Sequence, residues 1–322
     1  MFYTLTFNTS LDYVVHVDGL RVGDINKTCV YSLFPGGKGI NVSQVLSELG
    51  YDNVAMGFVA GHTGDCLEGL MHDMNLKTDF VHIDEGFTRI NMKIRSKDDE
   101  GKTVETDVNG TGPNVSEQEI RKLAEKLKCV RKGDTVIISG SVMSSIDAAT
   151  YGGIIKDIAA TGAKIAVDAI EGYLQAALES RPFLIKPNSR ELEDFFSGYD
   201  GKEVRIDTDE DIVSYAKRLQ DMGAQNVLVS LGEAGALLLS DDGRAWKMPA
   251  PQIEVVNTVG AGDSMVAGFM AGFEEKGDHG YALRLSVSAG SATTMSEGLA
   301  KKQTIEKLFV LAQRAIEIQG KR

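Results

Sequence analysis

The residues best suited to chemistry form a glycine-rich turn, Asn-Thr-Val-Gly-Ala-Gly-Asp-Ser, at positions 257–264. Apolar spacing after this turn predicts a helix over 262–275, and the free N-terminal amides of such a helix form an anion site without any basic side chain. Asp263 could accept a proton from a substrate hydroxyl while amides around Gly260, Ala261 and Gly262 stabilise a transferred phosphoryl group. The alternative is an ordinary glycine-rich helix start in which Asp263 interacts with the helix dipole.

A second glycine-rich segment, Pro-Gly-Gly-Lys-Gly-Ile-Asn-Val-Ser, covers positions 35–43 and leads into a predicted helix. Its glycines suit close approach of a ligand, and Lys38 and Asn41 add a cation and an amide. The Gly-x4-Gly-Lys-Ser/Thr spacing of a P-loop is absent, and so is the Gly-x-Gly-x-x-Gly turn of a dinucleotide site. A flexible loop is the alternative for this segment.

Two further segments fit a nucleotide site. Asn188 and Glu191 stand three apart at a predicted helix start, so they share a face, and their oxygens suit Mg²⁺ bound partly through water and phosphate. The same pair also fits an N-cap with glutamate at N3. Residues 229–236, Val-Ser-Leu-Gly-Glu-Ala-Gly-Ala, link two strands, and this link suits either a nucleotide contact or plain turn chemistry.

Short β-rich runs alternate with longer amphipathic stretches along the chain, which predicts a mainly parallel sheet covered by helices on both faces. The predicted strands are 2–7, 54–59, 135–139, 164–168, 183–185 and 226–230. The predicted helices are 39–49, 64–74, 116–128, 146–160, 189–196, 208–222, 262–275, 281–295 and 304–319. Ser116 and Glu119 have the spacing of a capping box.

Two segments, about 12–34 and 87–108, interrupt this alternation because they are rich in β-branched residues but lack helical spacing. Residues 88–95 alternate with period two and then turn at 98–101 into residues 102–107, which predicts antiparallel strands outside the main sheet. A small sheet cannot bury its apolar face alone. We therefore expect these strands to form a lid over the cleft that also serves as a homodimer interface.

Composition excludes several classes of function. The chain has 322 residues, of which 43% are hydrophobic, and its 34 basic and 46 acidic side chains give a net charge of −12. That charge repels nucleic acid and anionic membrane surfaces, so any phosphate must bind through local features. No apolar run approaches the roughly 20 residues of a membrane span, and no signal peptide is evident. Three scattered cysteines indicate reduced thiols in a cytoplasmic protein.

Taken together and in this order, these segments resemble the PfkB family of carbohydrate kinases. The resemblance runs from residue 4 past residue 291, and its most specific parts are Gly-Gly-Lys-Gly-Ile-Asn-Val at 36–42 and the turn at 257–264. Residues 87–93 and 139–141 are similar to the branch of the family that acts on hexose phosphates. The resemblance implies a single α/β domain over 1–322, a ribokinase-like αβα sandwich with a mainly parallel central sheet and a small antiparallel β-lid.

The family pattern also implies roles for individual residues. Asp263 resembles the catalytic base, with Gly260, Ala261 and Gly262 as the anion hole. The sugar phosphate would contact Asp12, Gly37, Lys38, Asn41, Arg89 and Ser139. ATP would contact Lys186, Asn188, Glu191, Ser230, Gly232, Gly235 and Ser288, with Asn188 and Glu191 organising Mg²⁺ partly through water.

The implied activity is ATP-dependent phosphorylation of a hexose phosphate to a hexose bisphosphate. Fructose 1-phosphate is the first expectation for the substrate, and tagatose 6-phosphate is the alternative. A third reading is a sensor of sugar phosphates that has the same fold but no turnover. Thr9, which stands where the family usually has proline, and the run Ala-Ile-Glu-Gly at 169–172 depart from the family pattern without affecting the expected base or metal groups.

Overall fold

The computed structural model describes residues 1–28, 30–98, 101–312 and 316–318. Within them a ten-stranded sheet has the order β14-β13-β12-β11-β10-β9-β8-β1-β4-β5. Its strands are β1 (Phe2–Thr6), β4 (Asn53–Ala60), β5 (Lys77–Ile83), β8 (Thr135–Ser139), β9 (Lys164–Asp168), β10 (Leu184–Ile185), β11 (Asn226–Ser230), β12 (Ala236–Leu239), β13 (Ala245–Met248) and β14 (Ile316–Ile318). Pairing is parallel from β5 through to β11 and antiparallel beyond β11.

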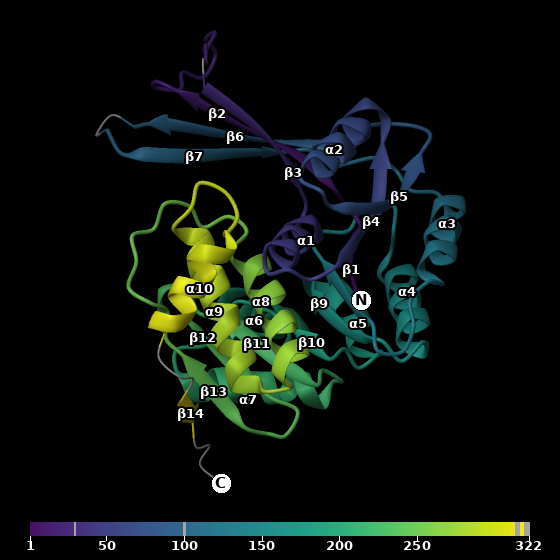
Figure 1. Cartoon of the computed structure of the whole chain (residues 1–322), viewed down its shortest axis with the longest axis vertical. Helices are drawn as coiled ribbons and strands as arrows, with labels where there is room; N and C mark the ends of the chain where they lie inside the picture. Colours follow the sequence, from purple (N-terminus) through teal and green to yellow (C-terminus); the bar gives the residue numbers. More distant parts are fainter. Residues whose placement is uncertain (29, 99–100, 313–315, 319–322) are drawn as a thin grey trace.

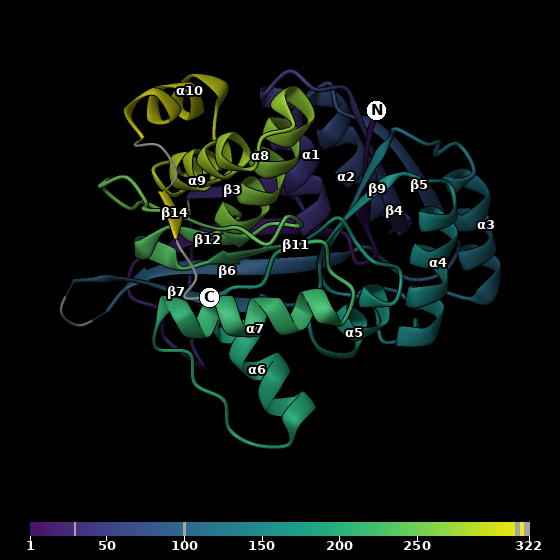
Figure 2. The same ribbon diagram turned by 90° about the horizontal axis from the view of Figure 1, so that it is seen from below.

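Helices cover both faces of this sheet, as the sequence predicts (Figure 2). The helices on one face are α3 (Glu117–Leu127), α4 (Ala148–Ala160), α5 (Glu171–Leu178), α6 (Ser189–Asp200) and α7 (Asp209–Asp221). The helices on the other face are α1 (Lys38–Glu48), α2 (Gly61–Asp73), α8 (Ala261–Lys276), α9 (His279–Thr294) and α10 (Lys302–Leu311). Neighbouring strand residues enter opposite cores, since Ile138 packs in the first layer and Ile137 in the second. The αβα sandwich is therefore confirmed.

A second, four-stranded sheet projects from one end of the molecule (Figure 1). It has the order β3-β2-β6-β7, formed by β2 (Ser10–Val17), β3 (Val30–Gly36), β6 (Arg89–Lys97) and β7 (Thr103–Asn109). We call this sheet the lid. Its two outer pairs are antiparallel, but β2 and β6 in the middle run parallel, because the chain crosses the main sheet between them.

The two faces of the lid differ in chemistry. Tyr13 is paired in register with Leu33 on β3 and Met92 on β6, and Met92 with Val108 on β7, so these four apolar side chains form one row on one face. Residues one position along point to the other face, where ion pairs join Lys93 to Asp107 and Arg95 to Glu105. The lid thus has one apolar and one charged face.

The sequence prediction was wrong at the C-terminus and incomplete elsewhere. The helix predicted over 304–319 ends at Leu311, and Ile316–Ile318 forms β14 instead, while residues 313–315 and 319 lie outside the described part. Ile316 and Ile318 alternate with Glu317, a strand period, and their backbone pairs with the otherwise open edge of β13. Helix α5 and strands β5, β12 and β13 were not predicted as separate elements. Of the helices in the described ranges, none is long and apolar enough to cross a membrane.

Candidate active site

The start of α8 brings an acid and backbone amides together, as the glycine-rich turn predicts. Gly260 is the N-cap in a left-handed conformation with φ +78°, which a residue with a Cβ rarely adopts. Asp263 follows in the first turn, and only 5% of it is exposed. The first amides of a helix precede its first intrahelical acceptors, so those of Gly262 and Asp263 stay free for an anion. The Asn41 side chain donates a 2.8 Å hydrogen bond to Asp263 Oδ2.

Asp263 is poised to work as a base near neutral pH. Burial raises its pKa to about 6, and the negative charge of Asp168 acts in the same direction. Lys38, the Asn41 hydrogen bond and Lys186 act in the opposite direction and favour the ionised carboxylate. A base with such a pKa is ionised at pH 7 yet binds a proton more readily than an exposed carboxylate does.

A buried ion cluster lies beside this base. Asp168, at the carboxyl end of β9, holds Lys38 Nζ at 3.1 Å through Oδ2 and Lys186 Nζ at 3.5 Å through Oδ1. Ser139, at the end of β8, donates to Asp168 Oδ2 at 3.2 Å. Burial opposes ionisation of Asp168, but the two lysines and the Ser139 hydroxyl outweigh it, so the pKa of Asp168 lies below its usual value.

Lys38 is the counterpart of that carboxylate. Burial works against its charge, but Asp168, Asp263 and Glu191 more than offset this, so the pKa of Lys38 is raised. Its side chain is 41% exposed, whereas that of Lys186 is 5% exposed. The cluster therefore presents one buried and one accessible ammonium group at the carboxyl ends of the parallel strands, where ligands of open α/β sheets bind.

The residues predicted to hold sugar hydroxyls lie between the lid and the start of α1. Asp12 accepts hydrogen bonds from the Ser10 hydroxyl and the Asn91 amide, both at 2.9 Å, so it is fixed to β6 of the lid. Gly37, with φ +112°, is the N-cap of α1, and a Cβ there would lie 2.8 Å from a methyl carbon of Thr6. A groove of about 950 Å³ reaches from Asp12 and Asn41 along the charged face of the lid.

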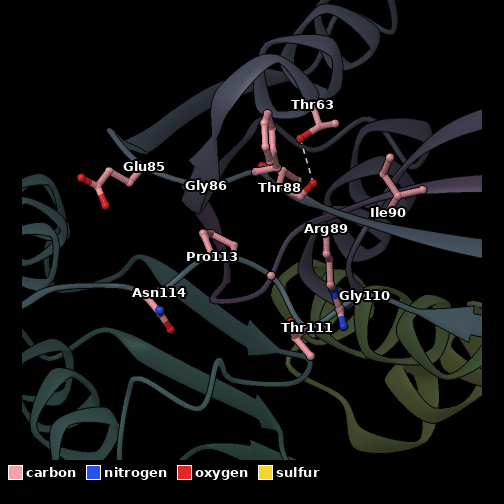
Figure 3. A pocket seen from close by; sticks show the side chains of 12 residues that line it. Thr63, Glu85, Gly86, Thr88, Arg89, Ile90, Gly110, Thr111, Pro113 and Asn114 are labelled. Atoms are coloured by element: carbon pink, nitrogen blue, oxygen red, sulfur yellow. Dashed lines mark hydrogen bonds between the residues drawn. The ribbon is translucent and has the colours of Figure 1, made fainter.

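Arg89 lines a separate cavity of about 640 Å³ at the base of the lid (Figure 3). One Nη donates to the carbonyl of Asn8 at 3.1 Å. Its Nε is buried and has no partner among the described residues, and the same holds for Asn8 Oδ1. Burial lowers the pKa of Arg89, although Asp12 opposes this effect. The unused donor of a buried guanidinium is suited to an oxyanion such as phosphate.

The structure brings together only some of the residues that were predicted to contact ATP. Asn188 and Glu191 form a complete capping box, in which the Glu191 amide donates to Asn188 Oδ1 and the Asn188 amide donates to Glu191 Oε2, both at 2.8 Å. The N-cap reading of this pair is therefore confirmed, which leaves Glu191 Oε1 as the oxygen outside the box. Asn188 and Ser230 meet in an isolated β-bridge, so Lys186, Asn188 and Ser230 line one edge.

The remaining nucleotide-side residues have structural roles. Gly232 begins a short 3₁₀ turn (Gly232–Ala234), and a Cβ on Gly235 would lie 2.0 Å from the Met248 carbonyl, so Gly235 allows the close passage of β13. Ser288 is wholly buried in α9 and donates to the Arg284 carbonyl, so its side chain is not open to a ligand in this structure.

The sequence reasoning missed Asp168, the centre of the ion cluster, and Asn8 and Asn91, which hold Arg89 and Asp12. A signal for Asp168 was present, because an ionisable residue at the carboxyl end of a buried parallel strand lies at the ligand-binding edge. Asn8 lies two residues beyond the carboxyl end of β1, at the same edge of the sheet. Nothing in the sequence pattern distinguishes Asn91 from the other polar residues of its strand.

A parallel α/β sheet with a helix N-terminus, a buried carboxylate and two lysines at its carboxyl edge, closed by a small sheet, defines an enzyme of the phosphotransferase class. Residues 6–305 match the pfkB family of carbohydrate kinases, and the chain belongs to this family.

Individual relatives agree with this assignment. The chain is 38% identical to a 1-phosphofructokinase of Bacillus subtilis over 96% of this chain and 97% of that one. It is 37% identical to a D-tagatose-1-phosphate kinase of Bacillus licheniformis over 93% and 94% of the two chains. A crystal structure of phosphofructokinase-2 from Escherichia coli in complex with fructose-6-phosphate is similar, with a TM-score of 0.86, 28% identity and coverage of 96% and 98%. The chain is thus a sugar kinase that uses ATP.

Proposed function

We propose that this kinase transfers the terminal phosphoryl group of ATP to the C6 hydroxyl of fructose 1-phosphate and forms fructose 1,6-bisphosphate. The observation that carries the proposal is the joint placement of Asp263 and Asn41 beside Lys38 and Lys186. The buried, unpartnered Nε of Arg89 supports an acceptor that already bears a phosphate. The name of the Bacillus subtilis relative supports the choice of fructose 1-phosphate.

In this mechanism the side chains and backbone amides of the chain position the two substrates and neutralise the charge of the phosphoryl group. Asp263 takes the proton of the acceptor hydroxyl as the phosphoryl group arrives, and the free amides at the start of α8 stabilise the charge on the equatorial oxygens. Lys38 and Lys186 neutralise the phosphate oxygens from two sides, while Asp12 and Asn41 orient the sugar hydroxyls. The lid excludes water from the cleft, which limits hydrolysis of ATP.

The oxygens beside this site fit Mg²⁺. Glu191 keeps one carboxylate oxygen outside its capping box, and no cluster of three or more metal-ligating side chains occurs within the described ranges. Mg²⁺ typically uses one or two carboxylates and completes its shell with water and nucleotide phosphates. We therefore place it at Glu191, with Asn188 nearby, where it would neutralise charge on the nucleotide phosphates.

The assay that tests the proposal measures ADP release with ATP and a panel of sugar phosphates at equal concentrations. The panel contains fructose 1-phosphate, fructose 6-phosphate, tagatose 1-phosphate and tagatose 6-phosphate. We expect the highest kcat/KM with fructose 1-phosphate. A higher kcat/KM with either tagatose phosphate would make tagatose, and not fructose, the preferred sugar. Thermal stabilisation by a sugar phosphate without ADP release with any of them would make the chain a sensor rather than a kinase.

We also propose that the chain forms a homodimer through the apolar face of the lid. On that face Tyr31 is 64% and Val108 is 58% exposed, while the charged face is directed to the groove. An exposed apolar sheet face of this kind is typical of an interface, and a second copy would cover it. A cytoplasmic location, expected from the sequence, stays a prediction.

A further inference from the structure

One buried carboxylate connects the sugar side and the ATP side of the cleft. Lys38 comes from the start of α1, next to the predicted sugar residues, whereas Lys186 follows β10 and leads to the capping box of α6. Asp168 lies between them, with a side chain only 2% exposed, and binds each lysine with a different oxygen. Neither glycine-rich motif contains Asp168.

Without Asp168 the two lysines would have a different partner. Both act electrostatically on Asp263, which is the other carboxylate of the cluster. Two ammonium groups that lie close together repel one another and are attracted to the nearest anion. With Asp168 neutral, that anion would be Asp263, and a base that is paired with lysine accepts a proton less readily.

Lys186 is also held at the place where phosphate would bind. A Cβ built on Gly262 would lie 3.2 Å from Lys186 Nζ, so this ammonium group sits at the first turn of α8, next to its free amides. The Lys186 side chain is 5% exposed, so burial fixes its position. The half-exposed Lys38 can move to an incoming ligand. The position of both ammonium groups depends on the same carboxylate.

We propose that Asp168 is a positioning residue for phosphoryl transfer, which holds Lys38 and Lys186 away from Asp263 and beside the N-terminus of α8. This inference rests on the proposed kinase function. It predicts that loss of the Asp168 charge affects turnover more than substrate binding, because the lysines remain present but act on the wrong carboxylate. The charged and titratable groups around Asp168 are Lys38, Lys186, Asp263 and the buried Tyr151 of α4.

The central experiment is Asp168→Asn, which keeps the shape and removes the charge. We expect kcat to fall by roughly 10²-fold, with KM for ATP changed by less than about threefold. The acid limb of the pH–rate profile should move to lower pH, because Asp263 loses an anionic neighbour and gains lysine partners. A kcat within about threefold of wild type, or an unmoved acid limb, overturns the inference.

A second variant separates charge from position and serves where Asp168→Asn does not fold. Asp168→Glu keeps the charge but displaces both ammonium groups by the length of a methylene. We expect its acid limb to match that of wild type while kcat falls at least about tenfold, since a small misplacement lowers transfer strongly. A wild-type kcat in Asp168→Glu shows that the location of the lysines is unimportant and rejects a positioning role.

A double variant tests whether Asp168 acts through Lys38. If it does, Asp168→Asn combined with Lys38→Gln should be no slower than the slower single variant, whereas multiplied losses contradict this route. Asp200→Asn is the matched control, because Asp200 holds Arg218 in a two-armed ion pair between α6 and α7 and its loss should leave kcat unchanged. An inactive wild type rejects the proposed function and this inference together, while an active wild type with unchanged Asp168→Asn kinetics rejects the inference alone.

Discussion

The side-chain amide of Asn41 donates to the carboxylate of Asp263 at 2.8 Å, although 222 positions separate the two residues in the chain. This bond joins the first turn of α1 to the first turn of α8, and therefore joins the two glycine-rich segments. It also fixes Oδ2 of the base and leaves Oδ1 outside this hydrogen bond. The two motifs are thus parts of one site, and changes in either should appear in the same kinetic step.

Replacing the base should abolish phosphoryl transfer. The same replacement should make the folded state more stable. Asp263→Asn retains an oxygen for Asn41 but cannot take a proton, so we expect kcat to fall by at least about 10³-fold with ATP binding retained. The raised pKa means that the folded state favours the protonated form, and stability from this group is lost as the pH rises through about 6. At pH 7.5 the variant should therefore be more stable, by up to about 3 kcal/mol.

Steady-state kinetics, nucleotide titration and thermal unfolding check this prediction together. Lower stability combined with full loss of activity would indicate that Asp263 supports the fold rather than the chemistry. Turnover at the wild-type rate would remove Asp263 from the role of base.

The pH dependence of turnover should follow the protonation of Asp263. Because burial raises the pKa of Asp263 to about 6, the base is protonated below that value and ionised above it. We expect kcat/KM for the sugar phosphate to fall tenfold per pH unit on the acid side, with a midpoint near 6. The measurement is a pH–rate profile between pH 5 and 8.5, run in buffers of constant ionic strength. A midpoint near 4, the ordinary value of an exposed carboxylate, contradicts it.

The sequence could predict the parts of the site that depend on local chemistry. The turn before α8 and the segment before α1 are continuous in the chain, so their glycines, Lys38, Asn41 and Asp263 could be recognised from spacing alone. Contacts between segments far apart in sequence could not. Asp168 looks like the last residue of a buried strand, and only the fold shows that two lysines meet there.

The limits of the fold prediction have a similar physical origin. Strand β14 follows α10 in a stretch with acceptable helical spacing, and it becomes a strand because the edge of β13 offers backbone partners. Local propensity contains no information about such an edge. By contrast, α3 and α7 begin where the sequence predicts. Capping boxes at Ser116 and Thr208 start these helices, and the hydrogen bonds of each box lie within four residues.

Gly262→Ala should lower activity. Alanine is favoured over glycine within a helix by up to about 1 kcal/mol, but this gain is offset where the added methyl group meets the buried ammonium group of Lys186. The new methyl group would lie 3.2 Å from Lys186 Nζ and occupy the space before the free amides, so we expect kcat to fall at least about tenfold. Gly153→Ala is the matched control, because Gly153 is exposed in the middle of α4 with nothing within 4 Å of its added Cβ. Equal kinetics of the two variants would show that the start of α8 does not receive the phosphoryl group.

Arg89 should act on the affinity for the sugar phosphate rather than on the chemical step. Removing the guanidinium in Arg89→Gln should raise KM for fructose 1-phosphate about 10- to 100-fold, with KM for ATP nearly unchanged. Arg89→Lys should recover only part of this affinity, because an ammonium group cannot bond to both Asn8 and a phosphate in the planar geometry. Kinetics with each substrate varied in turn test the split. An effect of equal size on both KM values would place Arg89 in a general structural role.

The apolar face of the lid should determine the oligomeric state. Val108 stands in register with Met92 and is 58% exposed, so Val108→Lys places a charge at the β7 end of the apolar row that a second copy would cover. We expect sedimentation to show two subunits for wild type and one for the variant, because an unpaired buried ammonium group is strongly unfavourable. Val310→Lys on α10 adds the same charge at a site 76% exposed and outside the lid, and it should leave the dimer intact. A single subunit in the wild type at assay concentrations, or dissociation by both variants alike, contradicts an interface at the lid.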